Sequence, residues 1–335
     1  FKLNSKVLTF AKLRAAFARV GSDASAEFLA TSYVLSDTFN GQPGASNSIL
    51  LGDQQITPEF TTEYEVGTEL EFFKKRISLD LSLYNKTTTN LITEVETPRS
   101  SGFEIYNTNV GEMNNKGIEI GLNLVPIQTN SFKWSLFTTF TKNKNKVIKI
   151  SDSLDRYGIP DEVGSAIPET SEQVGYVITG QPFGTFYGTR FARDTQGNYL
   201  IDPSSGGILA DVTPGIIGDP NADFKMSFIN TLTYKNFSLR TQFDWKQGGD
   251  IKSTTVESLL GRGVTRDTED REGLYIIPGY YGNVDGTPIL DANGAQIPNS
   301  TQITLNDMYF SPGTNGNTFA INSVDEATIY DGTVY

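Results

Sequence analysis

The sequence predicts an all-β fold built from long antiparallel strands, and three observations support this. Stretches in which apolar and polar residues alternate with a period of two are separated by segments rich in Gly, Pro, Asn and Asp. No apolar period of 3.6 residues persists beyond about two turns, so helices are expected only as short pieces within loops. The connections between the predicted strands also alternate between short and long.

The clearest strand pair covers residues 63–72 and 76–84, joined by a turn at 73–76. In the first strand, glutamates at alternate positions face away from an apolar row, and in the second, polar residues do the same. The apolar rows consist of Tyr64, Val66, Leu70 and Phe72, followed by Ile77, Leu79, Leu81 and Leu83.

Two further hairpins repeat the alternation and complete the set of strands. One has its turn at 125–131, which contains Pro126, and the other turns at Lys235-Asn236. Their strands lie at 118–124, 132–140, 224–234 and 237–245, and further strands near 12–20 and from Ala327 onward bring the expected total to about eight.

The long connections are expected to lie at one end of this sheet. In an up-and-down antiparallel sheet every second connection falls on the same side, and the short turns occupy the other positions. Long loops are predicted at 21–58, 92–105, 148–222 and 248–326, and acidic residues outnumber basic ones in all four. Outer-membrane β-barrels have this asymmetry, with short periplasmic turns and long extracellular loops.

The spacing of aromatic residues indicates the same class of fold. The pairs Tyr64 and Phe72, Phe132 and Phe140, and Phe237 and Trp245 each lie eight residues apart on an apolar face. At about 3.3 Å per residue and a tilt near 40°, this spans roughly 20 Å, close to the apolar band between the aromatic girdles of a barrel. We therefore predict a transmembrane antiparallel β-barrel segment with long extracellular loops.

Composition excludes several functions. The chain has no histidine and no cysteine, which removes Ser-His-Asp and Cys-His nucleophiles, thiolate metal sites and most zinc sites. A net charge of −12 argues against nucleic acid as a partner. Asp285-Gly286 and Asp291-Ala292-Asn293-Gly294 lack the EF-hand pattern and are better explained as turns. We predict no catalytic residue, no metal site and no cofactor.

Several motifs in one order resemble the SusC/RagA family of TonB-dependent outer-membrane transporters. Three adjoining segments near the third hairpin carry the strongest similarity, and shorter matches precede them across nearly the whole chain. These motifs are Ile217-Gly218-Asp219-Pro220-Asn221-Ala222-Asp223-Phe224, Asn230-Thr231-Leu232-Thr233-Tyr234-Lys235-Asn236-Phe237-Ser238-Leu239, Phe243-Asp244-Trp245-Lys246-Gln247-Gly248-Gly249-Asp250, Leu13-Arg14-Ala15, the strand from Glu63 to Phe73, Asn114-Asn115-Lys116-Gly117-Ile118-Glu119, Phe140-Thr141-Lys142-Asn143-Lys144-Asn145-Lys146-Val147 and Phe186-Tyr187-Gly188.

The resemblance implies that residues 1–335 belong to the C-terminal half of a roughly 22-stranded barrel in the outer membrane of a Bacteroidetes-type cell. It also implies energy-dependent import of a bulky nutrient, a glycan or peptide. A SusD-type surface lipoprotein would act as lid, and TonB would act through a plug region outside this chain. Five loop aromatics are candidates for contact with substrate or lid, although packing within the loops explains them more simply. They are Tyr176, Phe186, Tyr187, Tyr280 and Tyr281.

Two other classes remain open at this point. A soluble or cell-surface carbohydrate-binding β-sandwich would share the alternation and the aromatic content, and a carboxylate-based glycosidase would need only two of the 39 acidic residues. The decisive observation is the environment of Phe237, Leu239, Phe243 and Trp245. In a barrel these side chains face lipid, whereas in a sandwich they pack against a second sheet.

Overall fold

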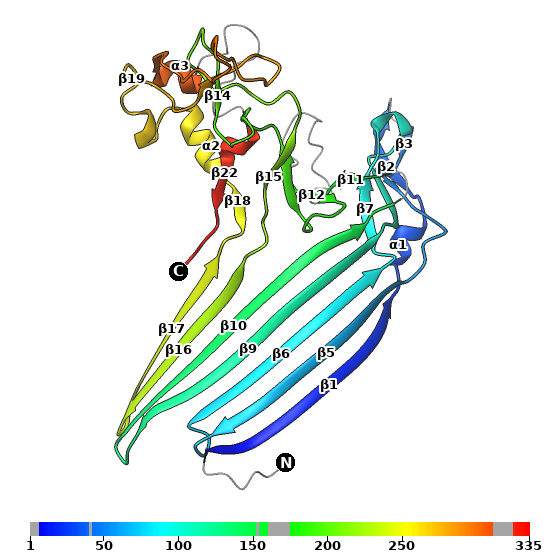
Figure 1. Ribbon diagram of the computed structural model, residues 1–335. Helices are drawn as coiled ribbons and strands as arrows, with labels where there is room; N and C mark the ends of the chain where they lie inside the picture. The colour runs from blue at the N-terminus through cyan, green and yellow to red at the C-terminus, as the bar shows by residue number, and fades with distance from the viewer. Residues whose placement is uncertain (1–6, 40–41, 152–153, 160–174, 311–323) are drawn as a thin grey trace. The chain divides into compact units, whose positions relative to one another are not determined.

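The structure, a computed structural model, describes residues 7–39, 42–151, 154–159, 175–310 and 324–335 (Figure 1). The chain forms two compact units. The first comprises Phe1–Thr185, Pro220–Gly249 and Gly332–Tyr335, and the second comprises Phe186–Asp219 and Asp250–Asp331.

A seven-stranded sheet dominates the first unit, and its strands follow one another across the sheet in chain order. Every neighbouring pair is antiparallel. The strands are β1 (Leu8–Ser22), β5 (Glu59–Phe72), β6 (Ile77–Thr89), β9 (Glu112–Gln128), β10 (Phe132–Lys149), β16 (Phe224–Tyr234) and β17 (Phe237–Gln247). The predicted fold class is confirmed, and the short turns all lie at one end of the sheet (Figure 1).

The first and last turns at the short end lie where the sequence predicts them, and only the middle one is shorter than predicted. In the first, three consecutive residues from Phe73 to Lys75 have positive φ angles, and Lys235 does so in the last. The middle connection shrinks to residues 129–131 because β9 continues through Pro126. Val125 and Pro126 together lie opposite Ser135, so the proline sits at a bulge, where its missing N–H leaves no gap in the ladder.

The eighth predicted strand is represented by two short pieces. Ile329–Asp331 (β22) pairs with Asp250–Lys252 (β18) in the second unit. Further on, Val334 bridges to Lys246 at the free edge of β17, and the Tyr335 ring lies 5.7 Å from that of Trp245. The last residues of the chain therefore extend the main sheet in the predicted order.

The apolar face of the main sheet is uncovered. Phe237, Leu239 and Phe243 are 79%, 58% and 64% exposed, and Leu13 and Phe17 at the opposite edge are also exposed. Within the described residues no second sheet packs against this face, which excludes a β-sandwich. Since hydrophobic side chains in water would be unfavourable over such an area, the face suits contact with lipid.

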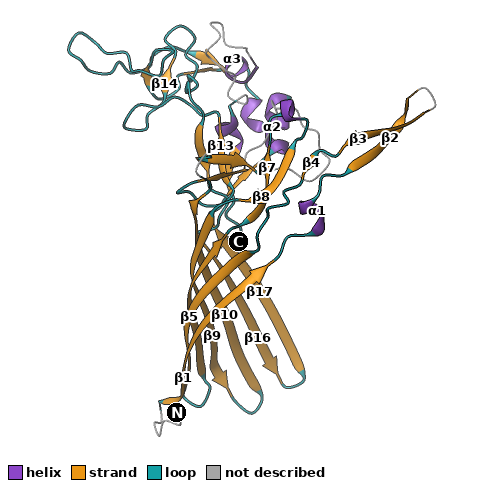
Figure 2. Ribbon diagram, turned by 90° about the vertical axis from the view of Figure 1, so that its right-hand side faces the viewer, coloured by secondary structure: helices purple, strands orange, loops and turns teal. Residues whose placement is uncertain are grey.

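The other elements lie in the connections, and Figure 2 shows that all helix is confined to them. None of the helices in the described residues has the length and hydropathy of a membrane span. The first unit contains α1 (Ala26–Leu29), β2 (Tyr33–Phe39), β3 (Gln42–Asn47), β4 (Leu50–Leu51), β7 (Ile92–Glu96), η1 (Arg99–Ser101), β8 (Ile105–Asn109), β11 (Arg156–Gly158) and β12 (Gly175–Ile178). The remaining elements are β13 (Thr185–Gly188), β14 (Leu200–Ile201), β15 (Gly215–Gly218), α2 (Thr254–Gly261), η2 (Arg266–Thr268), β19 (Leu274–Tyr275), β20 (Tyr280–Tyr281), β21 (Ile303–Thr304), α3 (Leu305–Phe310) and η4 (Asp325–Thr328).

The second unit has its own small core and is held together by residues far apart in the chain. Ile201 is fully buried and packs in a cluster with Phe191, Ile208 and Val324. Next to this cluster, Glu326 accepts hydrogen bonds from the Phe191 amide and from Arg193, at 2.8 and 2.6 Å. The predicted long loops 148–222 and 248–326 therefore contribute to one folded body, which the sequence did not reveal.

In the first unit, Asp53 anchors a connection to β8. Its carboxylate accepts hydrogen bonds from the hydroxyls of Tyr106 and Thr108, both at 3.0 Å. Burial raises the pKa of Asp53, but these bonds and one from the Gln55 amide outweigh burial and hold the pKa below its ordinary value.

We predict that the stabilising hydrogen bonds of the Asp53 carboxylate are lost only at acidic pH. Because the folded-state pKa is lowered, its contribution to stability is fully present above the pKa of an unfolded aspartate, about 3.9, and is lost as pH falls through the folded value. Amide exchange of residues 50–58, corrected for intrinsic rates, should therefore accelerate between pH 5 and pH 3. In the Asp53→Asn variant, exchange of these amides should be fast at both pH 5 and pH 3. An equal response of exchange to pH in the variant and the wild type would contradict the stabilising role of Asp53.

Candidate functional site

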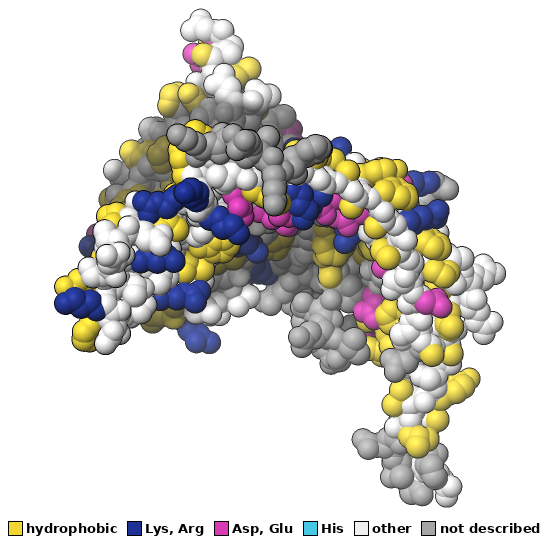
Figure 3. All heavy atoms as spheres, turned by 90° about the horizontal axis from the view of Figure 1, so that it is seen from below, with side chains coloured by type: hydrophobic (Ala, Val, Ile, Leu, Met, Phe, Trp, Pro, Cys, Tyr) yellow, Lys and Arg dark blue, Asp and Glu magenta, His cyan; other side chains and the backbone are white. Residues whose placement is uncertain are grey.

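The polar face of the main sheet is hollowed and densely charged. A cavity of about 530 Å³ lies over β1, β5, β6, β9 and β10. Figure 3 views the molecule from the short-turn end and shows acidic side chains gathered in a band bordered by lysines and arginines. The residues that line the cavity include Arg14, Glu69, Asp80, Glu119, Asn123 and Phe137.

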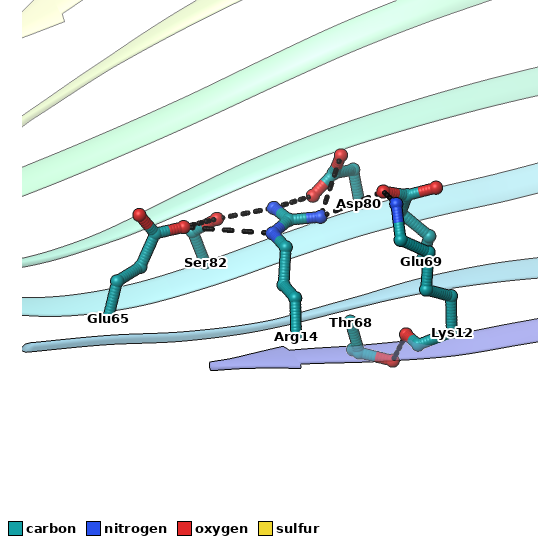
Figure 4. Close-up of polar contacts among 7 residues, drawn as sticks. All are labelled: Lys12, Arg14, Glu65, Thr68, Glu69, Asp80 and Ser82. Carbon is teal, nitrogen blue, oxygen red and sulfur yellow. Dashed lines mark hydrogen bonds and ion pairs between the residues drawn. The ribbon is translucent and has the colours of Figure 1, made fainter. Parts of the chain in front are cut away.

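Arg14 is the centre of this surface (Figure 4). Its Nη2 lies 2.6 Å from Asp80 Oδ1 and its Nη1 lies 3.1 Å from Glu69 Oε1. Its Nε approaches Glu65 Oε1 at 3.6 Å, and Ser82 Oγ accepts from Nη2 at 2.6 Å. One guanidinium thus bridges carboxylates from two strands. Lys12 adds a second cation, with Nζ 2.9 Å from Glu69 Oε1.

Strand register explains why these groups meet. Arg14 lies directly opposite Gly67 in β5, and Gly67 lies opposite Ser82 in β6. A Cβ at Gly67 would stand 2.5 Å from Arg14 Nε. The glycine therefore leaves room for the guanidinium to lie across β5 and reach Asp80 in β6.

Adding a methyl group at Gly67 should disrupt this arrangement. We predict that Gly67→Ala lowers the thermal unfolding midpoint of the full-length protein by a few degrees, because the guanidinium must move away from its carboxylates. The matched control is Gly121→Ala on the same face, where the nearest atom is 3.8 Å from the new Cβ. This control should be neutral or slightly stabilising. Equal midpoints for the two variants, measured by intrinsic fluorescence, would show that Gly67 does not serve this purpose.

A second hollow of about 370 Å³ continues the polar face toward the long connections. Tyr84 Oη donates to Asn143 Oδ1 at 3.2 Å, and the Asn143 and Asn145 amides donate to Asn115 Oδ1 at 3.0 and 2.9 Å. Amide and hydroxyl groups together with carboxylates give a surface suited to a hydrated interior. Glu63, Glu65 and Glu119 keep this hollow acidic as well.

The aromatic residues predicted to contact substrate or lid occupy several places. Tyr176 belongs to the first unit, where β12 pairs it with Gly158. In the second unit, Phe186 and Tyr187 lie in β13, and Tyr280 and Tyr281 form β20. All five side chains are half-buried. Phe186 and Tyr187 are therefore neighbours in one strand, and Tyr280 and Tyr281 are neighbours in another. The described residues do not form a single site that contains all five aromatics.

Two of these tyrosines have clear structural partners. Tyr187 Oη donates to Pro214 O at 2.9 Å. Tyr281 packs on the core cluster of the second unit, and its hydroxyl lies 3.0 Å from Ser300 Oγ and 2.9 Å from Thr301 Oγ1. Hydrogen bonds from Ser300 and Thr301 lower the pKa of Tyr281. Contact with substrate or lid remains a prediction for all five residues.

The described residues contain no group of three acidic side chains placed to hold a metal ion. Asp285 and Asp291 each cap their own turn, accepting from the Thr287 amide at 3.0 Å and the Asn293 amide at 2.8 Å. Hydrogen bonds from the Thr287 hydroxyl and amide lower the pKa of Asp285, and those from the Ala295 and Asn293 amides lower the pKa of Asp291. Both segments thus have the turn chemistry expected from the sequence.

The Arg14 network was not predicted as a site from the sequence. A signal was present, because Arg14 alternates with apolar residues and the glutamates of β5 do the same. What the sequence could not give was the pairing register that places Arg14 opposite Gly67.

Residues 8–215 match the family described as TonB dependent receptor-like, beta-barrel. The chain belongs to this family. Its polar inner face and exposed apolar face are what a receptor barrel requires, and the resemblance to SusC/RagA transporters is confirmed. The family is one of receptors and transporters rather than enzymes.

Curated relatives agree with this assignment. TonB-dependent receptor P3 of Formosa agariphila is 29% identical over 252 residues, which cover 66% of this chain and 25% of the relative. TonB-dependent receptor P26 of the same organism is 25% identical over 98% of this chain and 35% of its own length. TonB-dependent receptor SusC of Bacteroides thetaiotaomicron is 27% identical over 61% of this chain and 20% of its own length. The chain thus spans about a third or less of these relatives.

Solved structures share the fold. The RagAB peptide transporter superposes with a TM-score of 0.62 at 20% identity, covering 75% of this chain and 28% of that one. The RagAB peptide importer in its closed-closed state gives a TM-score of 0.64 at 17% identity, over 98% of this receptor chain and 34% of the importer chain.

Proposed function

We propose that this receptor chain forms part of the wall and the extracellular loops of an outer-membrane importer for a bulky nutrient, a glycan or a peptide. The observation that carries the proposal is the two-sided main sheet. One face exposes large apolar side chains, and the other carries the Arg14 network and two acidic hollows. Such a sheet is favourable only where one side meets lipid and the other meets water.

The direction of the sheet supports the placement of the loops. The tight turns at 73–76, 129–131 and 235–236 share one end, and the connections that contain β2–β4 and β7–β8 share the other. We place the long connections, including 148–222 and 248–326, outside the cell and the tight turns in the periplasm. We also place residues 1–335 in the C-terminal half of the barrel.

The partners follow from the same proposal. The chain would work with a SusD-type surface lipoprotein that rests on the long loops, and with TonB through a plug region outside this chain. The five loop aromatics, Tyr176, Phe186, Tyr187, Tyr280 and Tyr281, are offered as contacts for substrate or lid. Likeness to a RagAB peptide transporter makes peptides one substrate class to test, and glycans are the other.

Uptake by cells that carry the full-length gene tests the import proposal. A deletion strain should lose growth on a defined peptide mixture or on a defined glycan, and the full-length gene should restore it only when TonB is active. Affinity purification of the full-length protein in detergent should retain a surface lipoprotein. A monomer that stays soluble without detergent, or growth that is independent of TonB on every substrate tested, would overturn the proposal.

A further inference from the structure

A group of lysines lies on the apolar face of the main sheet, near its long-connection end. We name Lys116 in β9 and Lys142, Lys144 and Lys146 in β10 the outer lysine cluster. All four side chains are exposed. They concentrate positive charge on one small area of a protein whose net charge is −12.

The hollows in the surface and the strand pairing show that the outer lysine cluster lies on the apolar face of the main sheet. Lys116, Lys142 and Lys144 line a hollow of about 480 Å³ together with Leu83 and Ile118, which belong to the apolar rows. Neither of the two hollows on the polar face includes any of these lysines. The cluster therefore faces away from the Arg14 network and toward the side assigned to lipid.

The positive charges are uncompensated within the described residues. Lys116 and Lys144 lie directly opposite each other in adjacent strands, a placement that is destabilising for like charges. No salt bridge between described residues includes a cluster lysine. Glu119 in β9 lies on the other face, and Glu112 is four residues beyond Lys116, roughly 13 Å along the strand. The arrangement leaves the lysines available for an external anion.

The cluster begins where the apolar rows end. Ile118 and Phe140 each lie two residues closer to the short-turn end than Lys116 and Lys142. The Phe140 ring packs 5.5 Å from Phe224, which in turn lies 5.0 Å from Trp245. Aromatic side chains of this kind mark the boundary between lipid tails and headgroups. Lysines just beyond them can lay their stems on apolar surface and extend their ammonium groups into the headgroup layer.

We infer that the outer lysine cluster binds the phosphate groups of a phosphorylated glycolipid in the outer leaflet. This inference rests on the proposed membrane placement and orientation. Neighbouring cluster lysines of one strand are about 7 Å apart, so two or three can surround one phosphate. A phosphate placed there neutralises the opposed pair Lys116 and Lys144. The polar face is not required for this binding, which makes it separate from nutrient uptake.

Lipid binding by the full-length protein tests the inference. Purified receptor in mild detergent is titrated with lipid A, with dephosphorylated lipid A, with phosphatidylglycerol and with inorganic phosphate, and bound lipid is counted by native mass spectrometry. We expect lipid A to bind at least about tenfold more tightly than the other three. Binding of dephosphorylated lipid A or phosphatidylglycerol as tight as that of lipid A would overturn the inference, as would equal binding of free phosphate.

Matched variants locate the site. The triple variant Lys116→Gln, Lys142→Gln and Lys144→Gln should lose about tenfold or more in lipid A affinity. A control with the same change of charge, Lys74→Gln, Lys133→Gln and Lys235→Gln, alters exposed lysines near the short-turn end and should bind lipid A like wild type. Equal losses in both triples, or none in either, would overturn the inference. Lys144→Gln alone should show an intermediate loss and covers the case in which the triple variant folds poorly.

Failure of the inference is distinguishable from failure of the proposed function. If the protein imports its nutrient in a TonB-dependent way but wild type and the cluster variant bind lipid A equally, only the glycolipid site is wrong. If wild type is soluble without detergent and carries no lipid, the membrane placement itself is wrong.

Discussion

Phe243→Arg should prevent most of the protein from reaching the outer membrane in folded form. Phe243 lies on the apolar face of β17, between the aromatic positions Phe237 and Trp245, and is 64% exposed. If this face contacts lipid, an arginine near the centre of the bilayer costs about 2–4 kcal/mol, and less toward either interface. Folded barrels keep their structure in unboiled detergent samples, so the folded fraction in membranes can be read from gel mobility.

The adjacent residue provides a matched control. Gln242 lies in the same strand but on the polar face, where its amide donates to Asp244 at 3.0 Å. Gln242→Arg introduces the same charge beside a carboxylate and in contact with water, so the folded fraction should equal that of wild type. Equal folded fractions for Phe243→Arg and Gln242→Arg would mean that the apolar face does not meet lipid, and the barrel placement would fail.

The alternation of apolar and polar residues predicted the strands of the main sheet because the environment of each strand requires this period. A strand between lipid and water must present apolar and polar side chains in turn, so β5, β6, β16 and β17 could be read directly from their residues. The predicted turn at 125–131 is too long because proline usually ends a strand, whereas Pro126 lies at a bulge within β9.

The loop structure could not be predicted because it depends on contacts across more than a hundred residues. The bond from Phe191 to Glu326 joins positions 135 residues apart, and no periodicity marks either one. The Arg14 network similarly depends on which residue of β5 lies opposite Arg14. A one-residue slip in that pairing would have placed Gly67 beside a different side chain.

Ile201→Ala should unfold the second unit locally while leaving the main sheet intact. Ile201 is fully buried against Phe191, Ile208 and Val324, and its strand pairs with Tyr281. Truncating a buried isoleucine to alanine typically costs about 2–5 kcal/mol because a cavity remains. This core is small, so that loss is large relative to the stability it can provide.

Hydrogen exchange separates the two outcomes. In Ile201→Ala, peptides from 186–219 and 274–310 should exchange much faster, while peptides from β5, β6 and β9 keep their protection. Val212→Ala is the matched control, since Val212 belongs to the same unit but is 64% exposed, and its effect should stay within about 0.5 kcal/mol. If the proposed loops hold substrate or lid, uptake should fall in Ile201→Ala and not in Val212→Ala. Unchanged exchange in the Ile201 variant would mean that the second unit is not organised around this cluster.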